Sequence, residues 1–229
     1  MSDKDCRQFF EPQYSLLDDE LSLSGRASFG LMRSYTWNTD PKRLLFVLAR
    51  YKFAARILSG KRNVLEVGCG DGFCARIVKQ HVEKLTLTDV DPVLIQDARR
   101  VQSDKYPVIC EHHNFCNESW SQGRTFDGVY LLDVLEHVER ADENVFLTNI
   151  AASMTANGVI VVGMPSSESQ LYASEGSRAG HVNCKTQEEL RAAMENVFSN
   201  VFMFSMNDEL VHTGFARMAN YIFAVGVVG

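Results

Sequence analysis

Residues 64–73 have the sequence VLEVGCGDGF, and this stretch decides the fold. Its first four residues are mostly apolar and β-branched, a pattern that favours a buried strand. Three alternating glycines follow, and an amphipathic segment begins at Phe73. In doubly wound sheets, ligands bind outside the carboxyl ends of the strands, where glycines let the backbone approach them closely. The stretch therefore predicts a strand, a turn and a helix with a ligand site at the turn.

Downstream of residue 62, short apolar runs alternate with amphipathic segments. This order is typical of strands joined by crossover helices into a parallel sheet. The pattern predicts strands at 62–67, 84–89, 107–113, 127–132 and 158–163, with helices near 73–81, 92–103, 140–154 and 186–196. Two further strand-like runs, 200–206 and 220–228, are expected to pair as an antiparallel edge. The sequence thus predicts an α/β fold with a doubly wound, mostly parallel sheet of seven strands.

The N-terminal part has a different character. Residues 1–39 lack sustained periodicity and suggest an irregular lid. Asp40 and Pro41 then supply a helix cap and a first helical residue, which predicts a helix to about residue 58. We expect one domain, in which residues 1–60 are a lid and helix attached to the ligand-binding part, residues 61–229.

Composition limits the partners. Of the 229 residues, 23 are lysine or arginine and 29 are acidic, and the net charge of −6 offers no general attraction for nucleic acid. The N-terminus lacks the apolar segment of a secretion signal, and the apolar runs are strand-sized. We therefore expect a cytoplasmic protein without a membrane segment. The sequence does not indicate the oligomeric state.

The six cysteines include no Cys-x-x-Cys pair and are expected to be reduced thiols. Cys110 and Cys116 flank His112 and His113, but side chains alternate along a strand and would divide these groups between two faces. We therefore expect no metal site.

Two nucleotide-binding motifs can be compared with the glycine stretch. The dinucleotide fingerprint Gly-x-Gly-x-x-Gly/Ala needs a small residue where this chain has Phe73. A phosphate-binding P-loop needs Gly-x-x-x-x-Gly-Lys-Ser/Thr, which the sequence lacks. Neither NAD nor a nucleoside triphosphate is favoured.

The stretch instead resembles motif I of class I methyltransferases, acidic-x-Gly-x-Gly-x-Gly, at Glu66, Gly68, Gly70 and Gly72. The resemblance implies a Rossmann-like fold that binds S-adenosyl-L-methionine and releases S-adenosyl-L-homocysteine. It places Cys69 in the cofactor loop and implies that Glu66 acts through the ordered loop.

The resemblance extends to the end of the second strand. It implies that Asp89 accepts hydrogen bonds from both ribose hydroxyls, for which a carboxylate is suited because it only accepts. Val90 would lie against the adenine, and Asp91 would cap the next helix. Asn114 and Phe115 would meet the adenine amine through a side chain or the backbone.

Residues 126–138, FDGVYLLDVLEHV, resemble the fourth-strand signature of the small-molecule branch of this family. The resemblance implies that Leu132 and Asp133 contact the methionine moiety. Residues 181–190 are similar to a segment of ubiquinone-biosynthesis O-methyltransferases. Glu136 and His137 either cap and pack or take part in catalysis.

The expected reaction is methyl transfer to a small molecule, at oxygen by resemblance. A hydroxyl acceptor must lose its proton, and His181 or His137 is the candidate base because imidazole titrates near neutral pH. His181 can equally be a surface or capping residue. Tyr35 and Trp37 form an aromatic lid over the site or pack against the core.

Other functions stay open. A methyltransferase-like protein can bind the cofactor, or assemble with partners, without catalysis. The same fold can transfer an aminopropyl group or methylate an amine or a carboxylate of a small metabolite. The fourth strand does not end in Asp/Asn-Pro-Pro-Tyr, which argues against methylation of adenine or glutamine amino groups.

Overall fold

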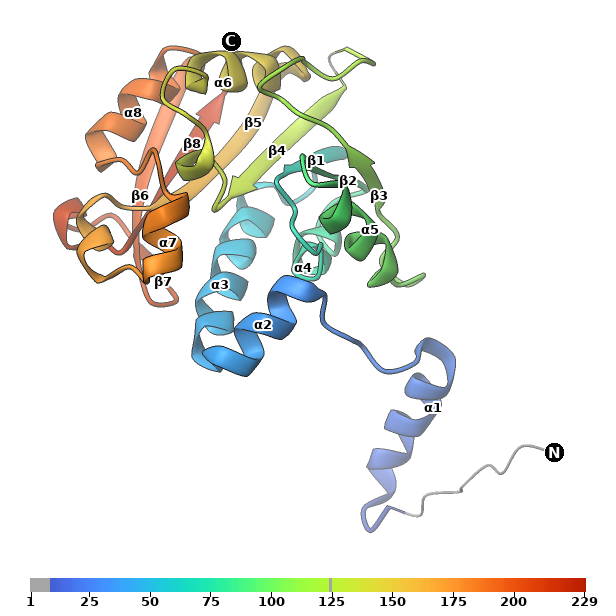
Figure 1. Ribbon diagram of the computed structural model, residues 1–229. Helices are drawn as coiled ribbons and strands as arrows, with labels where there is room; N and C mark the ends of the chain where they lie inside the picture. Colours follow the sequence, from blue (N-terminus) through green and yellow to red (C-terminus); the bar gives the residue numbers. More distant parts are fainter. Residues whose placement is uncertain (1–8, 124) are drawn as a thin grey trace.

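The computed structural model describes residues 9–123 and 125–229, and an eight-stranded sheet forms its centre (Figure 1). The strand order is β3-β2-β1-β4-β5-β8-β6-β7. Strands β1 to β5 run parallel, whereas β8 lies antiparallel between β5 and β6. The strands are β1 Asn63–Val67, β2 Lys84–Asp89, β3 Ile109–His112, β4 Phe126–Leu132, β5 Met154–Pro165, β6 Asn200–Asn207, β7 Leu210–His212 and β8 Tyr221–Val227.

This architecture confirms the predicted α/β fold with its antiparallel C-terminal edge. The difference is the short strand β7, which pairs with the end of β6 across a two-residue turn. Asp208 in this turn has φ 51°, a left-handed conformation that aspartate tolerates better than most residues. Three residues are too few to give a periodic signal, so the sequence predicted seven strands.

Eight α-helices and four short 3-10 helices accompany the sheet in the described residues. The α-helices are α1 Ser15–Ser24, α2 Leu31–Thr39, α3 Pro41–Ile57, α4 Ala75–Lys79, α5 Pro92–Arg100, α6 Glu143–Ala152, α7 Glu175–Gly180 and α8 Gln187–Glu195. The 3-10 helices are η1 Pro12–Tyr14, η2 Leu135–His137, η3 Glu168–Tyr172 and η4 Ala216–Met218.

The prediction of an irregular lid before residue 40 was wrong for the described part of that segment. Helices α1 and α2 occupy it, and neither has a fully buried residue. A helix without a buried face needs no apolar stripe, so periodicity could not find it. In Figure 1, α1 stands away from the sheet, whereas α2 lies close to α3 and α4.

The two faces of the sheet bury separate apolar clusters. Tyr51 of α3, Val78 of α4 and Ala98 of α5 belong to one cluster. Phe146 of α6 and Leu190 of α8 belong to the other. Helices thus cover both faces, and the carboxyl ends of the central strands are left to loops, as a doubly wound sheet requires.

Side-chain caps are present at α5, α7 and α8, but not at the other five α-helices of the described residues. The Asp91 carboxylate accepts a hydrogen bond from Val93 N at 2.8 Å and caps α5, as predicted. Thr186 and Glu189 form a reciprocal capping box at α8. Asp40 occupies the cap position of α3, but its side chain makes no capping hydrogen bond, so that part of the prediction was wrong.

Two further expectations concern the cysteines and the presence of a membrane segment. Cys69, Cys74, Cys110, Cys116 and Cys184 are free thiols, while Cys6 lies outside the described residues. Within residues 9–123 and 125–229, the structure has no helix whose length and apolar character would suit a bilayer crossing.

Candidate functional site

The glycine loop, residues 68–72, joins β1 to the segment before α4. Gly68, Gly70 and Gly72 have φ of 72°, 56° and 65°, which other residues adopt only with strain. The N–H groups of Gly68 and Cys69 donate to Thr88 O at 2.8 and 2.9 Å, and so hold the loop against β2. A Cβ at Gly68 would overlap Val134 Cγ2. The loop is therefore fixed in place by both conformation and close packing.

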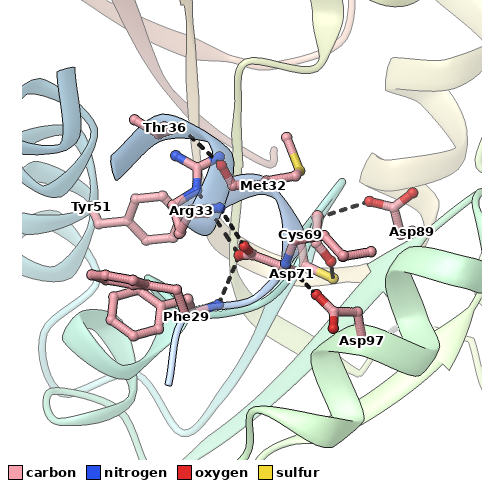
Figure 2. Close-up of polar contacts among 12 residues, drawn as sticks. Phe29, Met32, Arg33, Thr36, Tyr51, Cys69, Asp71, Asp89 and Asp97 are labelled. Atoms are coloured by element: carbon pink, nitrogen blue, oxygen red, sulfur yellow. Dashed lines mark hydrogen bonds and ion pairs between the residues drawn. The ribbon is translucent and has the colours of Figure 1, made fainter. Parts of the chain in front are cut away.

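Asp89 lies where predicted, at the carboxyl end of β2, with 8% of its surface exposed. One carboxylate oxygen accepts from Gly70 N at 2.9 Å (Figure 2), and the other accepts from Asp91 N at 2.9 Å. Each carboxylate oxygen has a second lone pair and can accept again. The backbone thus orients a group that can still receive two hydroxyl donors.

The residues predicted for adenine differ in accessibility. The Val90 side chain is 59% exposed at the end of β2, so it can offer an apolar surface to a ligand. Asn114 uses its Oδ1 to accept from Cys116 N at 2.9 Å within a turn. Phe115 is 1% exposed and belongs to the core. Its ring cannot reach a ligand, which leaves only its backbone for that role.

Glu66 is buried beneath the loop and directed into the protein. The Tyr51 hydroxyl donates to Oε1 and the Tyr130 hydroxyl donates to Oε2, each at 2.6 Å. Burial raises the pKa of Glu66 to about 8; the two hydroxyls oppose this shift, while Asp89 and Asp71 add to it. Glu66 thereby joins α3 to β4, and it can influence a ligand only through the framework that supports the loop.

The N-terminus of α2 is attached to the glycine loop, a contact that the sequence did not predict (Figure 2). Arg33 N donates to Asp71 Oδ2 at 2.7 Å, and Leu31 N donates to Asp97 Oδ2 at 2.6 Å. These N–H groups have no partner within the first turn of a helix, so two carboxylates complete them. Met32 Sδ lies against Gly70, where a Cβ would overlap it. The α2 segment is therefore the part of the lid region that covers the loop.

Tyr35 and Trp37, the predicted aromatic lid, lie on α2. Their side chains are 70% and 51% exposed, respectively. The Trp37 ring lies 5.8 Å from that of Phe29, which in turn packs 4.8 Å from Phe73. Trp37 thus packs against Phe29, which packs against Phe73 at the end of the glycine loop. Tyr35 is mostly exposed to solvent.

Leu132 is the last residue of β4, as the predicted strand 127–132 implies, and Asp133 follows it. Leu132 is 5% exposed, and Asp133 has φ 60°. The Asp133 carboxylate accepts two hydrogen bonds from Arg50 Nη1 of α3, at 2.7 and 2.9 Å. The Arg50 guanidinium also lies 3.9 Å from the centre of the Tyr221 ring. A left-handed backbone conformation and the ion pair with Arg50 therefore hold this carboxylate at the carboxyl end of the sheet.

Next to Asp133, the structure brings together Glu136, His137 and His181, which we call the acid–imidazole cluster. One ligand atom from each residue lies within 4.8 Å of the others. The sequence analysis expected no metal site and did not bring these three side chains together. The loop after β5 returns His181 to the end of β4. Residues 44 positions apart have no common local pattern, so spacing rules could not find the group.

Glu136 is fully buried. Neither of its carboxylate oxygens has a hydrogen-bond partner among the described residues. Burial raises the pKa of Glu136 well above its usual value, and the charge of Asp133 raises it further. A helix-capping side chain accepts a hydrogen bond from a backbone N–H group. The Glu136 side chain accepts none within the described residues, so it does not cap a helix.

The two histidines face each other, with ring centroids 5.1 Å apart and planes at 72°. His137 Nδ1 lies 2.8 Å from Gly180 O, and His181 Nδ1 lies 2.9 Å from Gln170 Oε1. Burial and the neighbouring His137 ring lower the pKa of His181. Both candidate bases named from the sequence therefore lie in one cluster, and His181 favours the neutral form.

A family model described as a methyltransferase domain matches residues 40–197. The ubiquinone biosynthesis O-methyltransferase of Methylocella silvestris is 35% identical over 92 residues, 40% of this chain and 35% of that protein. The mitochondrial enzyme of the same name from Schizosaccharomyces pombe is 30% identical over 107 residues, 45% of this chain and 38% of that protein. The matches thus span little more than a third of the length of these curated relatives.

Solved structures share the fold at low identity. The N-methyltransferase NodS from Bradyrhizobium japonicum, in complex with S-adenosyl-L-homocysteine, has a TM-score of 0.59 and 17% identity, covering 95% of this chain and 99% of that chain. A SAM-dependent methyltransferase from Archaeoglobus fulgidus has a TM-score of 0.63 and 16% identity, covering 86% and 99%.

Proposed function

The chain belongs to the methyltransferase domain family and carries a class I, S-adenosylmethionine-dependent methyltransferase domain, and on this premise we propose that it methylates a small molecule at an oxygen atom. The observation that carries this proposal is the acid–imidazole cluster at the carboxyl end of β4. A hydroxyl group must lose its proton when it is methylated, and the cluster has groups suited to promote that loss.

The residues around the glycine loop fit the cofactor. We assign the ribose hydroxyls to the Asp89 carboxylate and one face of the adenine to the exposed Val90 side chain. The left-handed glycines permit close approach of the methionine part of the cofactor. We further assign that part to Leu132 and to Asp133, whose charge suits an ammonium group. Bound there, S-adenosylmethionine would supply a methyl group bonded to a sulfonium sulfur, which departs as the neutral thioether of S-adenosylhomocysteine.

The protein's main contribution is then to position the acceptor. An oriented pair of reactants avoids much of the entropy cost of a bimolecular step. We propose that the acceptor hydroxyl lies next to His181 or His137 and that one of these imidazoles takes its proton. The names of two of the curated relatives, the ubiquinone biosynthesis O-methyltransferases, support oxygen as the methylated atom.

The experiment incubates the protein with S-adenosylmethionine and a panel of hydroxylated, amine and carboxylate metabolites. Formation of S-adenosylhomocysteine is measured, and the methylated atom is identified by NMR. We expect turnover with phenolic or aliphatic hydroxyl compounds. Turnover confined to amines or carboxylates, or none at all from protein that binds S-adenosylhomocysteine, would contradict the proposal.

The matched variant is His181→Ala. We expect turnover to fall by roughly 100-fold or more, in the range typical of a lost acid–base group, with unchanged affinity for S-adenosylhomocysteine. His81→Ala is the control, because His81 precedes β2 at the opposite end of the strands and its ring makes no hydrogen bond within the described chain. Equal turnover of the two variants would remove His181 from the reaction.

A further inference from the structure

We propose that helix α1 docks on helix α3 of a second copy of this chain, and that two copies exchange this contact reciprocally. The apolar residues of α1 and the tyrosine before it are between 40% and 88% exposed: Tyr14, Leu16, Leu17, Leu21 and Leu23. At 3.6 residues per turn they occupy one half of the helix surface, and Asp18 and Asp19 lie on the other half. Exposed apolar surfaces of this kind mark interaction sites.

The chain's own domain leaves this surface uncovered. In Figure 1, α1 stands away from the sheet, and a groove of about 790 Å³ lies between its second half and the loop after α5. The lining of the groove includes the basic side chains of Arg26, Arg76, Arg100 and Lys105. Leucines that moved into the groove would displace water from these charged groups, which is unfavourable. The leucines of α1 are therefore not stabilised by folding back onto their own domain.

One ion pair connects α1 to the rest of the described chain. Lys105 Nζ lies 2.9 Å from Glu20 Oε1, and the two side chains are 56% and 53% exposed. Ion pairs between exposed side chains contribute little to stability, because water competes for both charges. Helix α1 is therefore held only weakly to its own domain, and it can turn toward another molecule.

The segment that joins α1 to α2 gives α1 its reach. Residues 25–30 form neither helix nor strand, and Gly25 ends α1 with φ 69°. Six extended residues span roughly 20 Å. The far end of the segment is fixed, because Leu31 N donates to Asp97 Oδ2 at 2.6 Å. Helix α1 is thus an arm on a fixed base.

Helix α3 presents a surface that fits α1. Residues that recur every three or four positions form one line on its solvent-facing side, which we call the α3 stripe: Lys42, Leu45, Ala49, Lys52 and Arg56. Leu45 is 59% exposed. Lys42, Lys52 and Arg56 are also exposed, and none of them makes an ion pair with another described residue. The α3 stripe therefore combines exposed apolar surface with three uncompensated positive charges.

Charge complementarity favours the α3 stripe as the partner of α1. Helix α1 contains three acidic residues, Asp18, Asp19 and Glu20, and no basic residue. Opposite charges across an interface favour association, and like charges oppose it. Docking of α1 on α1 of the second copy would bring two such acidic sets together. An anionic lipid surface would repel α1 for the same reason, because helices that lie on membranes have basic polar faces.

The reciprocal arrangement enlarges the interface. A stable interface buries about 800 Å² on each partner. A ten-residue helix such as α1 is only about 15 Å long, so one contact of this kind falls short of that area. In a two-fold dimer each copy contributes both α1 and the α3 stripe, so the contact occurs twice.

The experiment measures the mass of the full chain in solution by analytical ultracentrifugation, from about 1 to about 100 µM. We expect a monomer–dimer equilibrium. Its dissociation constant should rise about 10-fold when NaCl is raised from about 0.05 to about 0.5 M, because salt screens exposed charges. Leu17→Ala combined with Leu21→Ala should raise the dissociation constant by roughly 10-fold or more at either salt concentration, because it removes apolar surface from the interface.

Charge reversal tests which two surfaces meet. Asp18→Lys combined with Asp19→Lys gives α1 a positive charge, and Lys52→Glu combined with Arg56→Glu gives the α3 stripe a negative charge. Each double variant should be monomeric by itself, because α1 and the α3 stripe then carry charges of the same sign. An equimolar mixture of the two should form a dimer, because each α1 then faces an α3 stripe of opposite charge.

The matched control is Glu118→Lys combined with Glu209→Lys, which changes the net charge equally at exposed residues outside α1 and α3 and should leave the dimer intact. Every variant should bind S-adenosylhomocysteine like the wild type, as evidence of an intact fold. A wild type that stays monomeric, a dimer that survives reversal of the α3 stripe, or a mixture that stays monomeric would overturn the proposal. Flotation of a monomeric wild type with vesicles of phosphatidylcholine and phosphatidylglycerol would overturn it in favour of a lipid surface.

Discussion

Two buried glutamates mark two regions of the site, and their surroundings are opposite. Glu66, under the glycine loop, accepts a tyrosine hydroxyl on each carboxylate oxygen at 2.6 Å. Glu136, at the end of β4, is equally buried, yet among the described residues its oxygens have no such partners. The first carboxylate is satisfied by the protein's own framework, whereas the second is left without a hydrogen-bond partner in the described part of the chain.

The comparison shows that burial of a carboxylate does not identify its role. A buried polar group with all its hydrogen bonds made rigidifies its surroundings. A buried polar group without them costs free energy that a ligand can recover. Glu66 thus stiffens the cofactor region through completed hydrogen bonds, whereas the buried Glu136 of the acid–imidazole cluster makes none within the described residues.

The largest expected effect tests whether Glu66 belongs to the framework. Its folded-state pKa of about 8 exceeds the usual 4.5, so the folded state holds the proton more tightly than the unfolded state. The stabilisation from this group is complete below about pH 4.5 and is lost as the pH rises through about 8. Relative to Glu66→Gln, the wild type should lose about 3 kcal/mol of unfolding free energy between pH 5 and pH 8.

Urea denaturation at half-unit pH intervals measures this difference. Tyr51→Phe is a useful companion, because it removes one of the two donors and should raise the pKa of Glu66 further. Wild type and Glu66→Gln curves that stay parallel across the range would show that Glu66 does not change its protonation on folding.

The next effect tests the ligand-facing part of the cofactor region. Asp89→Ala removes the acceptor that we assign to two ribose hydroxyls, and hydrogen bonds to charged groups are worth about 1.5–3 kcal/mol each. Calorimetry should show affinity for S-adenosylhomocysteine reduced by roughly 100-fold or more.

Asp91→Ala is the matched control for Asp89→Ala. It removes the cap of α5 and should cost about 1 kcal/mol of stability while leaving affinity unchanged. A similar loss of affinity in both variants would mean that the whole β2–α5 corner, and not the Asp89 carboxylate, determines binding.

The two regions also differ in how far the sequence predicted them. The glycine loop, Asp89 and the Asp91 cap are local: each follows from neighbouring residues on one strand–turn–helix unit. The acid–imidazole cluster joins η2 to the end of a loop more than forty residues later, and its geometry depends on the backbone bonds between residues 182–183 and Glu136 O. The sequence analysis named His137 and His181 as candidate bases, but it could not predict that their side chains lie close together.

The same distinction explains the other differences. Helix α2 was missed because its anchors, Asp71 and Asp97, belong to other elements. Phe115 was named as a ligand contact because it follows β3, but packing against the second core cluster turns its ring inward. Local patterns predict which elements form, and long-range packing decides which side chains remain available.

A smaller effect tests whether close packing against Val134 holds the glycine loop in place. Gly68 and Gly60 both have left-handed φ, 72° and 83°, but only at Gly68 would a Cβ meet a neighbour, Val134. Gly60→Ala should cost about 1 kcal/mol through backbone strain alone. Gly68→Ala should cost about 2–4 kcal/mol, because overpacking adds to that strain. Thermal unfolding compares them, and equal costs would show that the loop tolerates displacement from Val134.

The smallest expected effect concerns α8, which follows the segment that carries His181. Thr186→Ala removes a capping-box hydrogen bond to Glu189 N and should cost about 1 kcal/mol of stability. Because His181 is held by Gln170 and its neighbours by Glu136 O, methyl-transfer turnover should stay within about twofold of the wild type. A tenfold loss of turnover would instead mean that α8 positions the histidine, and the cluster would then depend on helix packing as well as on its own backbone contacts.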